Sequence, residues 1–509
     1  MRPSTDVIPV AFMPRQRRMA GMKALPGGKP RMLATWLVVT AAALLAGCTS
    51  IMPQALPETQ PGSTAAPVAG QWHAPLPHGG QVADLSRWWA QFNDPLLLHL
   101  IDAGQQASPT VAQASARLAD AQAARVAQNA VLKPSLDASV GASRGRPALD
   151  APVATESSAG LQLGWELDLF GAGRAAANAA QARLESSQAG WHDARVSVAA
   201  EIATTYVELR ACEILVQLAE IDAQSRARTA QITRLVADKG FRPPAEAELA
   251  NASAAQGNVT LIEQQTQCDL LVKALSALAA QNEAALRREL ASATGRLPRP
   301  AELAVTTMPA EMLAQRPDIH AAARDVEAAS ADSDQARAQR WPRITLAGNI
   351  GTTRIASGGI STNGSVWSIG PVTVTLPLFD GGTRRANAEA ARVRYQAATT
   401  VYAARLREAI RDVEDALVML DSTAKRSEDA ASAADGFTRS FETTDASYHA
   451  GIASLFELED ARRSMVAAQS TVIELQRERI TAWIRLYRAL GGGWPATEVH
   501  AARSEAAAQ

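Results

Sequence analysis

Two of the three cysteines in this 509-residue chain are spaced so that they could react with each other. Cys212 precedes Gly240 by 28 residues, and Cys268 follows the same glycine by 28 residues. If Gly240 marks the turn of a helical hairpin, the two thiols lie level on antiparallel helices. Leu261, Cys268 and Leu275 are seven residues apart, which places the second thiol on an apolar helix seam. In an oxidising compartment this spacing predicts a Cys212–Cys268 disulfide, and the alternative is a pair of buried thiols.

The third cysteine closes an N-terminal segment that is typical of a secreted protein. Positively charged residues precede an apolar run from Met32 to Ala46, which has the length of a signal-peptide core and is too short to cross a membrane. The run ends in the sequence LAGC, whose cysteine is Cys48, and this resembles the lipobox of bacterial lipoproteins. The resemblance implies a diacylglycerol on the Cys48 thiol and an N-acyl lipid on its amine. By the same resemblance, Thr49 in the next position, where an aspartate is absent, favours release to the outer membrane. We therefore predict a signal peptide at 1–47 and a lipidated extended tether at 48–84.

The remaining reactive side chains form no recognisable catalytic pattern. The seven histidines are scattered, and neither His-Glu-x-x-His nor Gly-x-Ser-x-Gly occurs. We therefore expect no enzyme activity, no metal and no cofactor apart from the covalent lipid. The chain has 50 Lys+Arg against 51 Asp+Glu, so it has no excess of cations for phosphates, and nucleic acid is not an expected partner.

One sequence pattern occurs twice, at a period near 209 residues. The sequence LFGAG at 169–173 recurs as LFDGG at 378–382, and Gly240 pairs with Gly451. A period this long indicates duplication of a whole structural module. The chain then divides into a first repeat at 85–305, a second repeat at 306–495 and a disordered tail at 496–509.

Each repeat contains two segments in which large apolar residues alternate with polar or small ones. Alternation places the apolar side chains on one face, and about ten residues suit a tilted membrane strand. We expect strands at about 135–143, 159–169, 343–352 and 366–379, with extracellular loops at about 144–157 and 352–363. The alternative is a soluble, half-buried sheet, but no other strand-rich region could cover the apolar face. Four aromatic residues are candidates for the membrane interfaces, with ordinary packing as the alternative for each: Trp165, Trp367, Phe170 and Phe379.

Four strands cannot close a barrel, and lipid does not tolerate an open sheet edge. The chain is therefore expected to oligomerise. Two copies would supply eight strands, whose interior is usually filled by side chains, whereas three would supply twelve and could enclose water.

Helices account for most of the remaining chain. Shorter helices are expected at about 109–131 and 318–340, and long hairpins at about 174–296 and 384–490. A proline-free helix from 174 to 238 would be roughly 95 Å long and would need coiled-coil packing. A cytoskeletal coiled coil is the alternative, and the signal peptide counts against it.

Several motifs together resemble one family, the TolC-like outer-membrane efflux lipoproteins of the NodT/OprM type. They are WWAQFNDPL at 88–96, QRPDI at 315–319, YHAG at 448–451 with LFELEDA at 455–461, and GGGW at 491–494. The resemblance spans Trp88 to Trp494 in order, and the first tip, KGFRPP at 239–244, matches weakly.

This resemblance implies a mainly α fold with a small membrane β-barrel. Four strands per chain would form a twelve-stranded barrel in a homotrimer, anchored in the outer-membrane lipid and extending into the periplasm. The implied function is a passive gated exit duct for small molecules in a tripartite efflux system. A periplasmic adaptor and an inner-membrane pump, commonly of the RND type, would dock at the hairpin tips, Gly240 and Gly451.

The resemblance also places a gate at Asp445, six residues before Gly451. Glu442 lies one turn away. On a threefold axis these carboxylates would form a ring that favours cations. The alternative is an ordinary solvated helix face.

A periplasmic adaptor-type structural lipoprotein is the competing function. Such a protein would also carry a lipid and a helical hairpin, but only one hairpin. Two hairpins and two strand pairs favour the duct.

Overall fold

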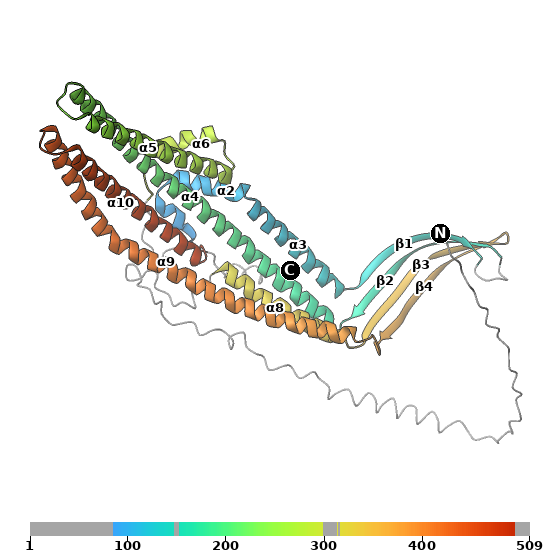
Figure 1. Cartoon of the computed structure of the whole chain (residues 1–509). Coiled ribbons are helices and arrows are strands. Elements are labelled where there is room, and N and C mark those ends of the chain that lie inside the picture. Colours follow the sequence, from blue (N-terminus) through green and yellow to red (C-terminus); the bar gives the residue numbers. More distant parts are fainter. Residues whose placement is uncertain (1–84, 147–151, 299–312, 314–315, 494–509) are drawn as a thin grey trace, which may run out of the picture. The chain divides into compact units, whose positions relative to one another are not determined.

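The computed structural model describes residues 85–146, 152–298, 313 and 316–493. The predicted signal peptide, Cys48 with its tether, and the predicted tail lie outside these residues. Each half of the described chain has the same order of elements: a helix, two strands, a very long helix and a shorter helix that returns along it (Figure 1). This order agrees with the duplication that the sequence period indicates.

Four strands form one antiparallel sheet in the order β1-β2-β3-β4. They are β1 (Ser135–Gly145), β2 (Ala154–Leu167), β3 (Arg343–Ser357) and β4 (Ile360–Thr375). Because β2 of the first repeat pairs with β3 of the second, the two repeats share a single sheet. Within the described residues, β1 and β4 each have one side without a partner strand.

The strands extend further into the predicted loops than the alternation indicated. Backbone pairing continues to Gly145, resumes at Ala154 and includes Ser357 and Ile360, so both predicted loops were too long. The added residues are mostly serine, threonine, alanine and glycine. These residues pair through backbone hydrogen bonds, but they carry no apolar alternation that a sequence pattern could detect.

At the opposite end, two strands stop before the predicted 169 and 379. The Asp168 carboxylate accepts hydrogen bonds from the backbone N–H groups of Gly173 and Arg174, so it caps the following helix instead of continuing β2. β4 ends at Thr375, two residues before Pro377, which has no N–H to donate to a sheet.

Two long helical hairpins follow the strands (Figure 1). The first is α4 (Ala172–Asp238) with α5 (Pro244–Ala279), and the second is α9 (Thr383–His449) with α10 (Leu455–Ala489). α3 (Pro109–Val131) packs on α4, and α8 (Pro317–Ala338) packs between α4 and α9. Neighbouring helices therefore follow the order α3-α4-α8-α9 next to the sheet and α5-α4-α10-α9 toward the tips. Among the described helices, none has a stretch both long and apolar enough to cross a membrane.

The first hairpin is shorter than predicted on its returning side. The sequence placed its end near 296, but α5 ends at Ala279 and Ala280 adopts a left-handed φ of 50°. The Asn282 side chain then caps a separate helix, α6 (Glu283–Leu290), which is followed by η4 (Ala291–Ala293). No glycine or proline marks the break, and the capping asparagine is its only local signal.

The main core forms where η3 (Leu85–Phe92) and α2 (Pro95–Ala107) cover α4, α5 and α10. The Trp88 ring stacks on Tyr487 with ring centroids 4.6 Å apart. Tyr206 Oη on α4 donates to Asp94 Oδ2 at 2.6 Å, and Asp94 Oδ1 accepts from two backbone N–H groups of α2. Burial raises the pKa of Tyr206, so its phenol stays protonated as a donor. One carboxylate thus caps α2 and ties it to the long helix.

Candidate functional site at the hairpin tips

Both hairpins turn at the glycines that the sequence predicted. Gly240 and Gly451 have φ values of 79° and 78°, in the left-handed region that favours glycine. The N–H of the next residue, Phe241 or Ile452, donates to a carbonyl of the preceding helical turn at 3.1 and 2.9 Å, respectively. Both of these apolar side chains are 82% exposed. Each tip therefore presents a glycine turn followed by an uncovered hydrophobic residue.

Tyr448 joins the end of α9 to the first hairpin. Its hydroxyl lies 2.8 Å from Thr233 Oγ1 on α4. The Arg242 guanidinium, which belongs to the first tip, lies 4.5 Å from the centroid of the Tyr448 ring. Tyr448 also belongs to a small buried cluster with Ala230, Ala250, Leu455 and Leu458. The two tips are therefore packed together within one chain.

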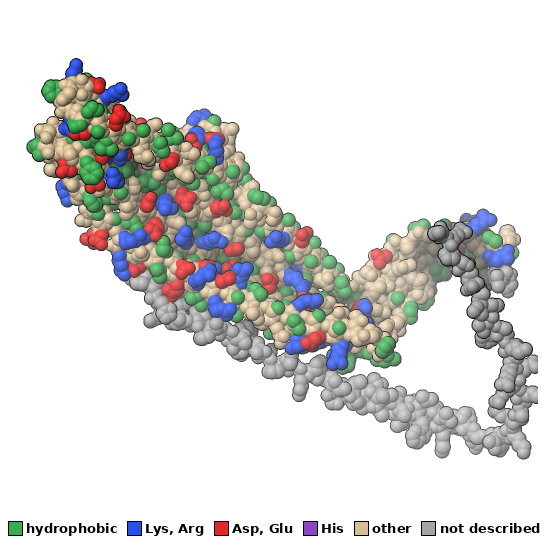
Figure 2. Space-filling view, in the orientation of Figure 1, with side chains coloured by type: hydrophobic (Ala, Val, Ile, Leu, Met, Phe, Trp, Pro, Cys, Tyr) green, Lys and Arg blue, Asp and Glu red, His purple; other side chains and the backbone are tan. Residues whose placement is uncertain are grey.

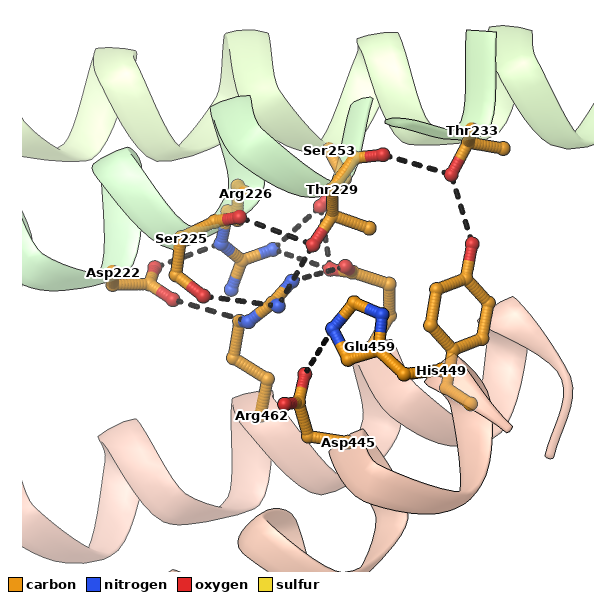
Figure 3. A network of polar contacts seen from close by, with 11 residues as sticks. Asp222, Ser225, Arg226, Thr229, Thr233, Ser253, Asp445, His449, Glu459 and Arg462 are labelled. Carbon is orange, nitrogen blue, oxygen red and sulfur yellow. Dashed lines mark hydrogen bonds and ion pairs between the residues drawn. The ribbon is translucent and has the colours of Figure 1, made fainter. Parts of the chain in front are cut away.

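A buried network of charged side chains fixes α10 on the first hairpin (Figure 3). Arg226 Nη1 on α4 donates to Glu459 Oε2 on α10 at 2.9 Å. Its Nε donates to Asp222 Oδ2 on the same helix at 2.7 Å. Ser253 Oγ on α5 donates to the same Glu459 oxygen at 2.5 Å. Three helices therefore converge on one carboxylate.

Arg462 is the most deeply buried charge of this network. Its side chain is 1% exposed and forms an ion pair with Glu459. Its Nη2 donates to Ser225 Oγ and Thr229 Oγ1, both at 3.2 Å. The network contains two guanidinium groups, of Arg226 and Arg462, and two carboxylates, of Asp222 and Glu459. Its positive and negative charges are therefore equal in number, and it carries no net charge. The sequence interpretation missed it because Arg226 and Glu459 are 233 residues apart and neither stands in a local motif.

The two predicted gate residues lie near the end of α9, outside this network. Asp445 is 37% exposed, and its Oδ1 lies 3.7 Å from His449 Nε2. Glu442, one turn earlier, is exposed. Such exposure suits both a gate and a solvated helix face.

The predicted disulfide is present. Cys212 Sγ on α4 and Cys268 Sγ on α5 are 2.08 Å apart, and their Cα atoms are 5.7 Å apart. The bond links the two helices of the first hairpin. The second hairpin contains no cysteine.

The motif QRPDI joins the second repeat to the end of α10. Arg316 Nη1 donates to the carbonyl of Ala489 at 3.1 Å, and its other nitrogens pair with Asp318 and Asp412. Burial disfavours the Asp318 carboxylate, but the hydrogen bonds and charge of Arg316 outweigh burial and hold its pKa below the usual range. α8 therefore begins where α10 ends. Arg316 donates to a carbonyl at the end of α10, and its partner Asp318 accepts the Ile319 N–H in the first turn of α8.

One face of the sheet is apolar and exposed. The register places on it residues from all four strands, among them Leu136, Leu161, Leu163, Ile350, Trp367, Ile369 and Val372. The opposite face is polar and carries contacts such as Gln162 Nε2 to Ser139 Oγ at 3.4 Å. The sheet thus has one apolar and one polar face, as the alternation of residues predicted.

The four aromatic residues predicted at membrane interfaces lie in different surroundings. Trp165 Nε1 donates to the carbonyl of Leu132 at 3.2 Å. Phe170 stacks on Trp341 with centroids 5.8 Å apart, and Trp367 and Phe379 are exposed. Their interfacial role stays a prediction.

No cluster of metal-binding side chains occurs in the part of the chain that the structure describes.

Two long hairpins, a duplicated module and a sheet with one exposed apolar face define the class of outer-membrane channel subunits. The chain belongs to the outer membrane efflux protein family, whose model matches residues 100–281 and 308–492. The two matched segments fall in the two repeats.

Individual relatives agree with this assignment. The chain is 27% identical over 477 residues to the solvent efflux pump outer membrane protein SrpC of Pseudomonas putida, covering 89% of this chain and 97% of the relative. It is 29% identical over 439 residues to the outer membrane protein OprJ of Pseudomonas aeruginosa, covering 84% and 91%.

Solved structures share the fold. The outer-membrane channel OprN superimposes with a TM-score of 0.76 at 25% identity, covering 84% of this chain and 97% of that one. The outer membrane protein VceC of Vibrio cholerae gives 0.70 at 25% identity, covering 81% and 99%. The chain is thus an exit duct of the bacterial outer membrane, in a family of passive channels, and the adaptor alternative is wrong.

Proposed function

We propose that three copies of the chain close into one channel, with a twelve-stranded barrel in the outer membrane and a helical tunnel in the periplasm. The observation that carries this proposal is that the described subunit leaves strand edges unpaired and most of α9 uncovered. In the part of the chain that the structure describes, β1 and β4 are open edges of the sheet. α9 buries nine of its 67 residues, whereas α4, of the same length, buries 25. An open edge in lipid leaves backbone groups unpaired, so neighbouring copies must cover it.

The number three comes from the family resemblance, and the interior that the duct needs agrees with it. Two copies would supply eight strands, an interior that side chains fill, and three would supply twelve. The apolar sheet face would then meet lipid and the polar face would line water. Fatty acyl chains on Cys48 would add a second membrane attachment.

The gate of this channel would be formed by Asp445, with Glu442 one turn away. Three symmetry-related copies would bring these exposed carboxylates toward the axis and favour cations. The buried network of Arg226, Glu459 and Arg462 would hold α10, and through it α9, in the resting position. Opening would then require α10 to separate from the first hairpin.

The tips would dock the other components of the system. Gly240 and Gly451 each precede an exposed apolar residue, and a periplasmic adaptor could bury both. An inner-membrane pump, of the RND type, would supply the energy, and substrate choice would lie with pump and adaptor. The duct itself would stay passive.

Oligomeric mass tests the assembly directly. Native mass spectrometry of the detergent-purified full-length protein should give a trimer that persists on dilution. A monomer, or a dimer as the largest species, would contradict the twelve-stranded barrel.

A further inference from the structure

The apolar face of the sheet ends in two arginines at the end that carries the strand-connecting loops. Residues directly opposite each other in an antiparallel pair point to the same face. Arg144 of β1 lies opposite Thr155, and Arg354 of β3 lies opposite Ser157. Positions 155 and 157 lie on the same face of β2 as Leu161, because the side-chain period of a strand is two. Both arginines therefore point to the apolar side.

The spacing places these arginines at one edge of the apolar band. The last apolar row next to the helices contains Leu167 and Ile344, which pair with each other. Ser157, opposite Arg354, is ten residues away along β2, roughly 33 Å at about 3.3 Å per residue. For a strand tilted by about 40°, this corresponds to a height of about 25 Å, the height of the apolar band of an outer-membrane barrel. Arg144 lies one row further out.

Among the residues that the structure describes, no group accounts for these two charges. Both side chains are exposed, and neither forms an ion pair or hydrogen bond through its guanidinium with another of the described residues. The nearby acidic side chain of β2, Glu156, lies on the opposite face. Lys and Arg side chains gather at this end of the sheet (Figure 2). Arginine on a lipid-facing surface costs about 2–4 kcal/mol at the membrane centre and little at its interface, so the interface is where these residues can be placed.

We propose that Arg144 and Arg354 bind the phosphate groups of lipopolysaccharide in the outer leaflet. This inference rests on the proposed barrel, which turns the apolar face toward lipid. The loop end of the sheet is opposite to the helices, so it faces the outer leaflet. Guanidinium groups bind phosphate with bidentate, charge-assisted hydrogen bonds. The two arginines lie on strands separated by one strand and in adjacent rows, so they suit a headgroup that carries two phosphates on a disaccharide.

The test compares lipid binding by the full-length protein and two variants, measured by native mass spectrometry in detergent. The double variant Arg144→Gln/Arg354→Gln removes both charges. The control, Arg343→Gln, removes an arginine from the helix-side end of β3, where it pairs with Glu166 on the polar face. The probes are bisphosphorylated lipid A, its dephosphorylated form and phosphatidylglycerol.

We expect lipid A to bind the double variant about thirtyfold more weakly than the wild type, since each basic residue at an anionic membrane surface contributes on the order of fivefold. Arg343→Gln should bind like the wild type, and dephosphorylated lipid A should bind all three proteins equally weakly. The proposal would be overturned if wild type and double variant bound lipid A with equal affinity, or if the wild type bound dephosphorylated lipid A as tightly as lipid A. Phosphatidylglycerol binding as tightly as lipid A, through the same arginines, would overturn the assignment to the outer-leaflet glycolipid.

Planar-bilayer conductance of the same samples separates this inference from the proposed function. The double variant should conduct like the wild type, because its substitutions lie far from the tips. Conductance without any difference in lipid binding contradicts the lipid site alone. Absence of conductance from every sample contradicts the duct itself, and with it the basis of the lipid site.

Discussion

At the residue scale, Arg462 and its neighbour Arg463 have opposite environments. Arg462 is buried against Glu459, Ser225 and Thr229, whereas the Arg463 side chain is 72% exposed and pairs with the exposed Asp460. Removing one partner of a buried ion pair leaves an uncompensated charge, which typically costs about 3–5 kcal/mol. An exposed pair contributes about 0–1 kcal/mol.

We therefore expect Arg462→Met to lower the melting temperature of the purified protein clearly, and Arg463→Met to leave it nearly unchanged. Tryptophan fluorescence during heating measures both. In planar bilayers, Arg462→Met should also show a larger resting conductance, because α10 loses the Arg462 hydrogen bonds that attach it to α4 of the first hairpin. Equal melting temperatures for the two variants would show that the network does not hold the hairpins together.

The Cys212–Cys268 bond closes a loop with a sequence separation of 56 residues. By the chain-entropy model it stabilises the fold by about 4 kcal/mol at most. Denatured wild-type protein should expose neither of these two thiols to an alkylating mass tag until a reductant is added, and should then gain two tags. A Cys212→Ser variant should expose the Cys268 thiol without reductant. Two tags on unreduced wild-type protein would contradict the disulfide.

At the scale of elements, the junction of α8 with α10 depends on a charged pair that acid should weaken. The pKa of Asp318 is held low by Arg316 despite burial. A carboxyl with a lowered folded-state pKa stabilises the fold above its unfolded pKa, and this stabilisation is lost as pH falls through the folded pKa. The affected window therefore lies below about pH 4, the ordinary carboxyl value.

We expect Asp318→Asn to melt at a lower temperature than the wild type at neutral pH, with the difference shrinking below about pH 4. Asp415→Asn is the control, because the Asp415 side chain is 72% exposed and pairs with an exposed arginine, Arg411. Melting curves from pH 3 to 7 provide the comparison. A difference that is constant across this range would show that Asp318 does not act through its charge.

The elements themselves were largely predictable from the sequence. Period-two alternation located the apolar part of each strand, and the absence of proline located the long helices. The strand ends near Gly145 and Ala154 were missed because small polar residues pair without any apolar signal. The break at Ala280 was missed because tertiary packing of Leu286 and Leu290, rather than a glycine or proline, separates α6 from α5.

At the scale of the whole molecule, the sequence duplication predicted most of the architecture. A period near 209 residues predicted two hairpins and their glycine tips, and the equal spacing of Cys212 and Cys268 from Gly240 predicted their level pairing. The contacts between repeats carried no such signal, because they join residues far apart in the sequence, 233 positions for Arg226 with Glu459 and 215 for Thr233 with Tyr448. Sequence periodicity therefore predicts the helices and strands within each repeat. The contacts that pack the two repeats together become visible only in the folded structure.

The measurement that tests the central claim most directly is single-channel conductance of the purified full-length protein in planar bilayers, compared with Asp445→Ala. The account predicts small, cation-favouring channels for the wild type, and larger channels with weaker cation preference for the variant, because three carboxylates leave the constriction. Unaltered conductance and selectivity in Asp445→Ala would contradict the gate. Absence of any channel in the wild type would contradict the duct.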